Sequence, residues 1–383
     1  MGSVRNLGEP LRFENAEQLA GFTASAAKKG ERVEVITRLS MTSDEPRFHR
    51  FVESFVDAVR SMAQRSGEYV SLRHANTVLL VMKAQNVAEL WIDTGAVSLL
   101  VRTKRAIKAH TAVFESDIAD ITGMTFPCVE FADDDKVFCL FRLDWRFGFA
   151  FDVNPKGQFD RDGFSSTLGS LYRVMRYRHL YDAMQDSSTF SRLVGAGWFP
   201  FAELIATEFK ELIHHCEVGL DIADVEERIL RDFDASRLQF LRERWVAKAH
   251  FAARISLLDE AICAFLARRP VAVIKILLTE IEGILNDAYR AMHEGRGAPI
   301  KELLTFAEAS GEQNAGAPDT LLFTRAFGRY LRQHTFESFD PTGKRGRASS
   351  RHAVGHGAAS AESYTMVRAL QAILVVDQLA FFT

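Results

Sequence analysis

The chain has 383 residues, of which 47% are apolar and 25% are charged, a composition that is typical of globular proteins and excludes an intrinsically disordered one. This length is comfortable for two hydrophobic cores. The formal net charge of −3 excludes a protein that is basic over its whole surface, so any nucleic-acid-binding surface must be local.

Targeting and redox signals favour a cytoplasmic protein with no membrane partner. Residues 1–13 contain no apolar h-region, so we expect no secretory signal there. The apolar stretch Leu370–Phe382 is about half as long as a membrane-spanning helix and is interrupted by Asp377 and Gln378. The cysteines lie far apart without a CxxC pair, so neither a disulfide framework nor a zinc site is expected. They are Cys128, Cys139, Cys216 and Cys263.

Residues 1–155 are predicted to form an α+β domain. Stretches with a 3.6-residue period predict helices at 15–29 and 45–67. Short runs rich in β-branched and aromatic residues then predict an antiparallel sheet of about six or seven strands. The expected strands are 68–74, 77–83, 88–94, 97–103, 127–133, 136–145 and 147–154, with hairpin connections at Asp133–Asp135 and Arg146–Gly148.

The segment Asn154–Gly163 is the plainest break in the chain, because it combines proline, two glycines and four charges. Everything after it is predicted to be helical, with 164–224 as a connecting region and 225–383 as a helical bundle. Expected helices are 164–186, 200–219, a long stretch within 225–268, 271–295, 321–336 and 360–382, with a loop at 311–320 and a turn-rich segment at 339–357.

An arginine followed by a histidine, with four to six residues between them, occurs seven times in this chain, so the spacing alone identifies no site. Only Arg351 is followed directly by a polar side chain, His352, before the histidine of its pair, His356. This pair also lies just before the final helix of an all-helical segment. Its context therefore makes it the candidate catalytic group.

Arginine and histidine suit the cleavage of RNA, whose own 2′-OH is the nucleophile, so that no metal or other cofactor is required. Histidine titrates near neutral pH and can accept or donate the proton. The guanidinium stays charged and matches phosphate oxygens. Two copies paired about a twofold axis would supply acid and base separately, leaving a 2′,3′-cyclic phosphate. The alternative is an exposed basic loop without a catalytic role.

The Arg351–His356 motif follows the helical stretch Ala272–Tyr289, precedes Tyr364–Phe382, and resembles the HEPN family of helical-bundle domains over roughly residues 225–382. The resemblance implies a bundle of about four or five helices that dimerises with two motif copies at the interface. It implies Arg351 and His356 as the catalytic pair and His352 as the auxiliary polar residue. Many members are toxins or antiviral-defence proteins that cut RNA. Gly355 and Gly357 depart from the family pattern, because glycine disfavours a regular helix across the motif.

Basic residues elsewhere allow two interpretations each. Lys344, Arg345 and Arg347 precede the motif and are predicted to contact the RNA backbone, although each residue alone also fits a solvated loop. Residues 102–110 form a basic strand and turn that either binds nucleic acid or faces water. Residues 172–178 interleave arginines with tyrosines, which fits base stacking or, more commonly, a packed helix face with a charged rim.

A metal-dependent nuclease is the competing catalytic interpretation. Asp134 and Lys136 form a D-x-K unit, with Asp117 or Asp120 upstream, but they fall on a predicted hairpin tip rather than on a buried strand.

Two further groups of residues bear on the site. Neighbouring residues on a helix point in different directions, so the adjacent His214, His215 and Cys216 are not expected to chelate one ion. Glu280 and Glu282 are either solvated or, in one case, paired with Arg351 across the bundle.

The sequence therefore predicts a metal-independent endoribonuclease that acts as a homodimer on RNA, with the N-terminal domain as a sensor or regulator and an antitoxin or regulatory protein as a further partner. The alternative is a non-catalytic bundle for dimerisation or for binding a partner or nucleotide. A buried ion pair between Arg351 and an acidic residue of the same chain would favour that alternative.

Overall fold

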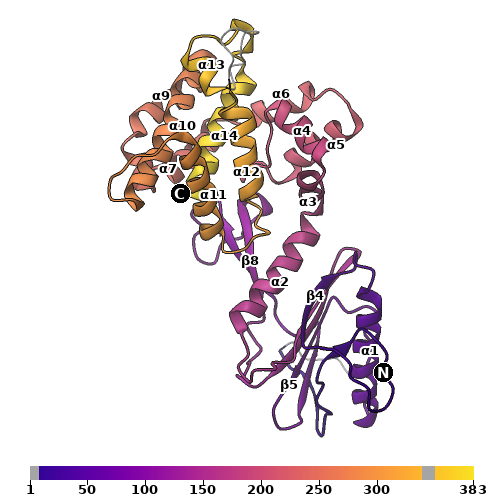
Figure 1. Cartoon of the computed structure of the whole chain (residues 1–383). Helices are drawn as coiled ribbons and strands as arrows, with labels where there is room; N and C mark the ends of the chain where they lie inside the picture. Colours follow the sequence, from indigo (N-terminus) through magenta and orange to yellow (C-terminus); the bar gives the residue numbers. More distant parts are fainter. Residues whose placement is uncertain (1–7, 339–349) are drawn as a thin grey trace. The chain divides into compact units, whose positions relative to one another are not determined.

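The computed structural model describes residues 8–338 and 350–383 (Figure 1). The chain divides into two compact units: unit 1 contains Met1–Val101 and Ile121–Arg178, and unit 2 contains Arg102–Asp120 and His179–Thr383. Unit 1 holds an antiparallel sheet with helices and unit 2 is mainly helical, which confirms the predicted order of an α+β part and a helical part.

The bounds of the units differ from the segments 1–155, 164–224 and 225–383 that the sequence suggested. Helix α2 (Arg161–Arg176) belongs to unit 1, because its apolar face packs on the sheet. Residues 102–120 belong to unit 2 although strands of unit 1 precede and follow them in the sequence.

Unit 1 is built on a six-stranded antiparallel sheet with the strand order β1-β6-β5-β9-β10-β4. At its centre Leu79 of β5 lies opposite Cys139 of β9, and at one edge Phe149 of β10 lies opposite Met41 of β4. The strands of the chain are β1 Leu11–Phe13, β2 Phe22–Thr23, β3 Val35–Ile36, β4 Arg38–Thr42, β5 Thr77–Met82, β6 Ala88–Ile92, β7 Ser98–Thr103, β8 Ile118–Thr125, β9 Lys136–Leu143 and β10 Arg146–Asp152.

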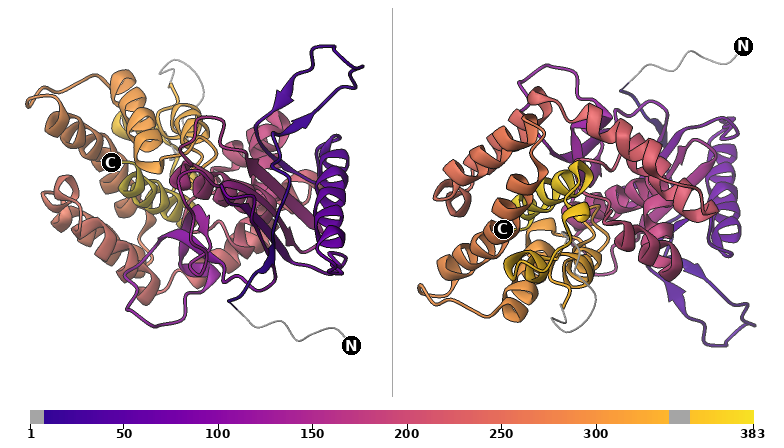
Figure 2. Two further views of the ribbon diagram at one scale, coloured as in Figure 1. Left: turned by 90° about the horizontal axis from the view of Figure 1, so that it is seen from below. Right: turned by 90° about the horizontal axis from the view of Figure 1, so that it is seen from above.

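Both faces of this sheet are covered, which explains the nearly unbroken apolar run of β5. Successive side chains of a strand point to opposite faces. Val78 and Leu80 therefore join the core under helix α1 (Phe48–Arg65), whereas Leu79 and Val81 join the core under α2. Figure 2 shows α1 lying along one face of the sheet.

Several predictions for this unit are wrong. Residues 15–29 form no helix, because Phe22 lies in β2 and packs its ring edge against Phe51 of α1, with the ring centroids 6.0 Å apart. Residues 68–74 and 127–133 form no strands. The β9–β10 turn lies at Asp144–Trp145 rather than at 146–148, with Asp144 at φ 55°. The short strands β1 to β4 and strand β8 were not predicted.

Strands β7 and β8 form a separate two-stranded ribbon rather than extending the main sheet. Gly123 in β8 lacks a side chain, and Gly169 of α2 packs directly against its backbone. This close approach between a helix and a strand leaves no room for a side chain at position 169.

Unit 2 is an assembly of short helices. The stretch expected as one helix at 164–186 is broken at Tyr177, and the stretch 225–268 forms four helices. The segment 311–320, expected as a loop, begins as the end of a helix. The helices of the chain after α1 are α2 Arg161–Arg176, α3 Arg178–Gln185, α4 Ser187–Ala196, α5 Thr207–Val218, α6 Ala223–Asp232, α7 Ala235–Val246, α8 Ala249–Ala252, α9 Ile255–Leu266, α10 Pro270–Met292, α11 Ile300–Ala315, α12 Thr324–Tyr330 continuing into a π-helix at Leu331–Thr335, α13 Arg351–Gly355 and α14 Met366–Phe382.

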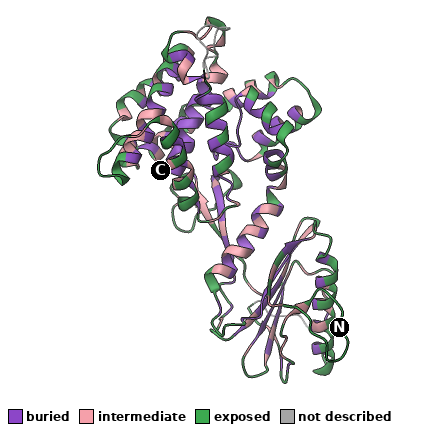
Figure 3. Ribbon diagram, in the orientation of Figure 1, coloured by how far each residue is buried: buried purple, intermediate pink, exposed green. Residues whose placement is uncertain are grey.

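Helix α14 forms the centre of unit 2. All its residues from Ala369 to Phe382 are buried, and Figure 3 shows it as an almost uniformly buried helix. It packs against α10 and α11 and also contacts α6, α7 and α9. Among the residues that the structure describes, no helix combines the length and apolarity needed to span a membrane.

The packing of α2 predicts that Gly169→Ala destabilises the protein. An added Cβ would lie 2.4 Å from the Cα atom and 2.6 Å from the backbone nitrogen of Gly123. Displacing the backbone of β8 would disturb the packing around it. We therefore expect the free energy of unfolding, measured by urea denaturation, to fall by about 1–3 kcal/mol.

The control is Gly195→Ala in α4, where an added Cβ meets no heavy atom within 4 Å. It should be neutral or stabilise by up to about 1 kcal/mol. Equal urea midpoints for Gly169→Ala and the wild type would contradict the packing described for α2.

Candidate functional site

The predicted catalytic motif lies on the short helix α13. Ser350 caps its N-terminus: the Oγ atom accepts a hydrogen bond from Ala353 N and donates one to Glu337 O at 2.9 Å. The helix ends at Gly355 with His356 as its C-cap, and Gly357 follows with φ +66°. The motif is therefore helical for five residues and no further: Gly355 is part of the helix, whereas Gly357 lies beyond its end.

Arg351 forms an ion pair within its own chain. Its Nη2 atom lies 2.5 Å from Oε2 of Glu282 in α10, with 34% and 32% of the two side chains exposed. The pair is thus open to solvent rather than buried. The sequence had named Glu282 as one of two acidic residues that could reach Arg351. The other, Glu280, is buried and pairs with Arg254 at 2.6 Å.

The two histidines of the motif are more accessible than Ala353 and Val354, which lie between them. His356 is exposed and His352 is half-buried, whereas Ala353 and Val354 are buried and anchor α13 to the bundle. At about 100° per residue, five residues turn a side chain by about 140°. Arg351 and His356 of one chain therefore do not share a helix face.

The predicted RNA-contacting residues Lys344, Arg345 and Arg347 lie outside the described residues.

The structure gives the metal-dependent nuclease interpretation no support. Asp134 is exposed in a turn, and Lys136 donates through Nζ to Leu19 O at 3.0 Å. Asp117 pairs with Arg105 at 2.5 Å, and Asp120 accepts a hydrogen bond from Leu321 N at 3.2 Å.

Within residues 8–338 and 350–383, no cluster of three or more His, Cys, Asp or Glu side chains is arranged to hold a metal ion. This holds for His214, His215 and Cys216, whose side chains differ in environment: His214 is exposed and Cys216 is buried.

The tyrosine- and arginine-rich segment 172–178 is largely packed rather than free to stack on bases. Arg173 is buried, and its Nη1 atom donates to Ile121 O. Tyr177 is buried as well.

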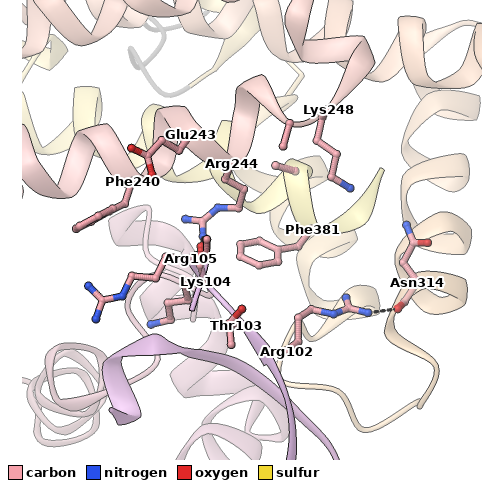
Figure 4. A pocket seen from close by; sticks show the side chains of 13 residues that line it. Arg102, Thr103, Lys104, Arg105, Phe240, Glu243, Arg244, Lys248, Asn314 and Phe381 are labelled. Atoms are coloured by element: carbon pink, nitrogen blue, oxygen red, sulfur yellow. Dashed lines mark hydrogen bonds between the residues drawn. The ribbon is translucent and has the colours of Figure 1, made fainter. Parts of the chain in front are cut away.

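The structure reveals a second candidate site, which we call the basic pocket, with a volume of about 530 Å³ in unit 2 (Figure 4). The sequence had drawn attention to residues 102–110 as basic but not to the helical residues that complete the pocket. Those residues are far away in the sequence, so no local pattern could have grouped them. The pocket is lined by Arg102, Thr103, Lys104, Arg105, Ala106, Phe240, Glu243, Arg244, Ala247, Lys248, Asn314, Ala380 and Phe381.

A buried charge network supports one wall of the basic pocket. Arg244 of α7 donates through Nε and Nη2 to the carboxylate of Asp377 in α14, at 2.9 and 3.0 Å. It also contacts Glu203 at 3.1 Å and donates to Lys104 O. Trp245 Nε1 donates to Asp377 at 3.1 Å. Burial raises the pKa of Asp377, and Arg244 opposes that rise by stabilising the carboxylate.

Comparison with known proteins gives no relative to guide the assignment: no protein-family model matches this chain, and neither the curated proteins nor the solved structures contain a significant match.

The Arg351–Glu282 pair predicts that Arg351→Ala leaves the protein folded. A solvent-exposed ion pair contributes little, so we expect the free energy of unfolding to fall by no more than about 1 kcal/mol in urea denaturation. A fall of several kcal/mol would show that Arg351 is a structural residue, contrary to its exposure.

The Arg244–Asp377 pair predicts a much larger effect for Asp377→Asn. Without the charge of this buried carboxylate, the positive charge of Arg244 has only Glu203 as an ion-pair partner. We therefore expect the free energy of unfolding to fall by about 3–5 kcal/mol. The matched control is Glu312→Gln, which removes the carboxylate of the exposed Arg325–Glu312 pair. Similar urea midpoints for both variants would contradict the importance of the buried pair.

Proposed function

We propose that this protein is a metal-independent endoribonuclease of the HEPN type. Arg351 and His356 form the catalytic pair and His352 is the auxiliary polar residue. The observation that carries the proposal is the placement of α13, where an arginine and two histidines lie within six residues and the terminal histidine is exposed.

The chemistry of the proposal follows from these side chains. One histidine takes the 2′ proton, a second protonates the leaving 5′ oxygen, and the guanidinium stabilises the charge on the phosphorane. Arg351 and His356 of one chain point about 140° apart, so a second copy supplies the facing groups across a homodimer interface. The one-third exposure of Arg351 leaves its guanidinium accessible to a phosphate.

The same proposal includes the biological setting. Lys344, Arg345 and Arg347 contact the RNA backbone, and unit 1 acts as the sensor or regulator. The protein works in the cytoplasm as a toxin or an antiviral-defence effector, with an antitoxin or another regulatory protein as a partner. These roles rest on the resemblance to the HEPN family and on the soluble composition of the chain.

The second candidate is a non-catalytic bundle that dimerises or binds a partner or nucleotide. The pairing of Arg351 with Glu282 in the same chain favours it, because Glu282 compensates the charge that a phosphate would otherwise meet. The exposure of this pair weakens the argument, since a buried pair would fix Arg351 more firmly.

The test is incubation of the purified protein with labelled transfer and messenger RNA in the presence of EDTA. We expect cleavage that leaves 2′,3′-cyclic phosphate ends. Because Arg351→Ala removes the charge stabilisation and His356→Ala removes a proton transfer, each variant should lower the rate by about 10²–10⁴-fold.

His214→Ala and Arg325→Ala are matched controls, because both side chains are exposed and lie outside the motif. Absence of cleavage by a folded wild-type dimer would favour the binding bundle. Cleavage that is unchanged in Arg351→Ala and His356→Ala would exclude α13 as the active site.

A further inference from the structure

The basic pocket carries more positive charge than its neighbours compensate. Three elements supply its cations: the segment at the end of β7, helix α7 and Lys248, the N-cap residue of α8. A single acidic side chain, Glu243, lines it. The basic lining residues are Arg102, Lys104, Arg105, Arg244 and Lys248.

Two of these cations already have carboxylate partners. Arg244 is paired with Asp377 and Glu203, and Arg105 is paired with Asp117. Both guanidiniums also lie over aromatic rings: Arg244 is 4.6 Å from the ring centroid of Phe381, and Arg105 is 5.4 Å from that of Phe240. These contacts fix the orientation of the guanidinium groups.

The other three cations have no carboxylate side chain as an ion-pair partner in the described part of the chain. Arg102 donates to Asn314 O, and Lys248 donates to Thr383 O at 2.6 Å. Lys104 is only 7% exposed, and its ammonium reaches Glu203 O at 3.5 Å. Each side chain keeps further N–H donors, because an ammonium has three and a guanidinium has five.

The positive charges of Arg102 and Lys248 repel each other in the basic pocket. Burial lowers the pKa of Lys248, and the nearby positive charge of Arg102 lowers it further. Burial also lowers the pKa of Lys104, whereas the nearby carboxylates of Glu203 and Glu208 oppose that fall. Like charges held together in a partly buried site repel each other, and an anion between them relieves that repulsion.

The size of the basic pocket fits a small molecule. A volume of about 530 Å³ lies within the range of roughly 300–1,000 Å³ that is usual for ligand sites. Phe240 and Phe381 give the pocket apolar surface beside its cations (Figure 4). This combination suits a ligand with a multiply charged end and a less polar remainder.

We propose that the basic pocket binds the phosphate groups of a small phosphorylated ligand of the size of a nucleoside triphosphate, with Arg102 and Lys248 as the direct phosphate contacts. Charge-assisted hydrogen bonds from these two side chains hold the phosphates. The apolar rings contact the remainder of the ligand.

This pocket is separate from the motif on α13. Phe381 lies at the C-terminal end of α14, a helix of 17 residues that is about 25 Å long at 1.5 Å per residue. The motif precedes the other end of the same helix in the sequence. In Figure 1, α13 lies above α14, and the C-terminus lies away from it. The proposal therefore does not depend on the ribonuclease assignment.

The test is isothermal titration calorimetry of the full chain with ATP, tripolyphosphate and adenosine. We expect ATP and tripolyphosphate to bind and adenosine, which has no phosphate, to bind at least about tenfold more weakly. Equal affinity for ATP and tripolyphosphate would indicate that only the phosphates are recognised. Tighter binding of ATP would indicate that the pocket also contacts the nucleoside. Both results support the proposal.

Substitutions locate the binding. The double variant Arg102→Gln/Lys248→Gln should weaken ATP and tripolyphosphate binding by about tenfold or more, because it removes two charge-assisted hydrogen bonds. The control Arg296→Gln/Lys301→Gln removes the same charge from an exposed surface outside the pocket and should bind as the wild type does. Lys248→Arg preserves the charge and should retain binding, which separates loss of charge from misfolding.

Three results would overturn the proposal. The first is no binding of either anion by the folded wild-type protein. The second is binding that persists unchanged in the folded Arg102→Gln/Lys248→Gln variant. The third is a single-stranded RNA oligonucleotide that displaces ATP and binds far more tightly, with its binding lost in the same variant, since the pocket would then be part of an RNA path.

Discussion

The ion pair between Arg244 and Asp377 is the contact on which the organisation of unit 2 depends. Asp377 is 1% exposed and sits within a central helix that is otherwise almost entirely apolar. A charge at such a position is tolerated only when it is paired and hydrogen-bonded. The two hydrogen bonds from Arg244 and a third from Trp245 meet this requirement and fix α14 against α7.

The other buried polar residues of α14 follow the same principle. Gln371 donates to Ala196 O at the end of α4, and Gln378 accepts a hydrogen bond from Ala202 N. Each interior polar side chain thus satisfies a backbone group of a different neighbour. Hydrophobic burial makes α14 central, whereas these directional contacts determine which segments surround it and in what register.

The charge network also explains why the basic pocket and the α13 motif differ in character. Arg244 reaches both Asp377 and the carbonyl of Lys104, so the segment 102–106 is held against α7 and its cations are brought beside Lys248. The motif on α13, in contrast, is supported by Ala353 and Val354 and by one solvent-open ion pair. Tertiary packing therefore assembles the basic pocket, whereas the α13 motif lies on a single short helix.

The sequence by itself determined the features that depend on residues close together in the chain. Helix α1, the central strands β5, β6, β9 and β10, the helical nature of unit 2 and the nearness of Arg351 to His356 follow from periodicity, β-branched runs and short spacing. Whether the Arg351 motif is catalytic remains a prediction. Tertiary structure alone decided the rest: Gly123 and Gly169 form a close contact, Phe22 lies in a strand, and Arg102 shares a pocket with Lys248. These features join residues that are distant in the chain, and only packing and the pairing of buried charges bring such residues together.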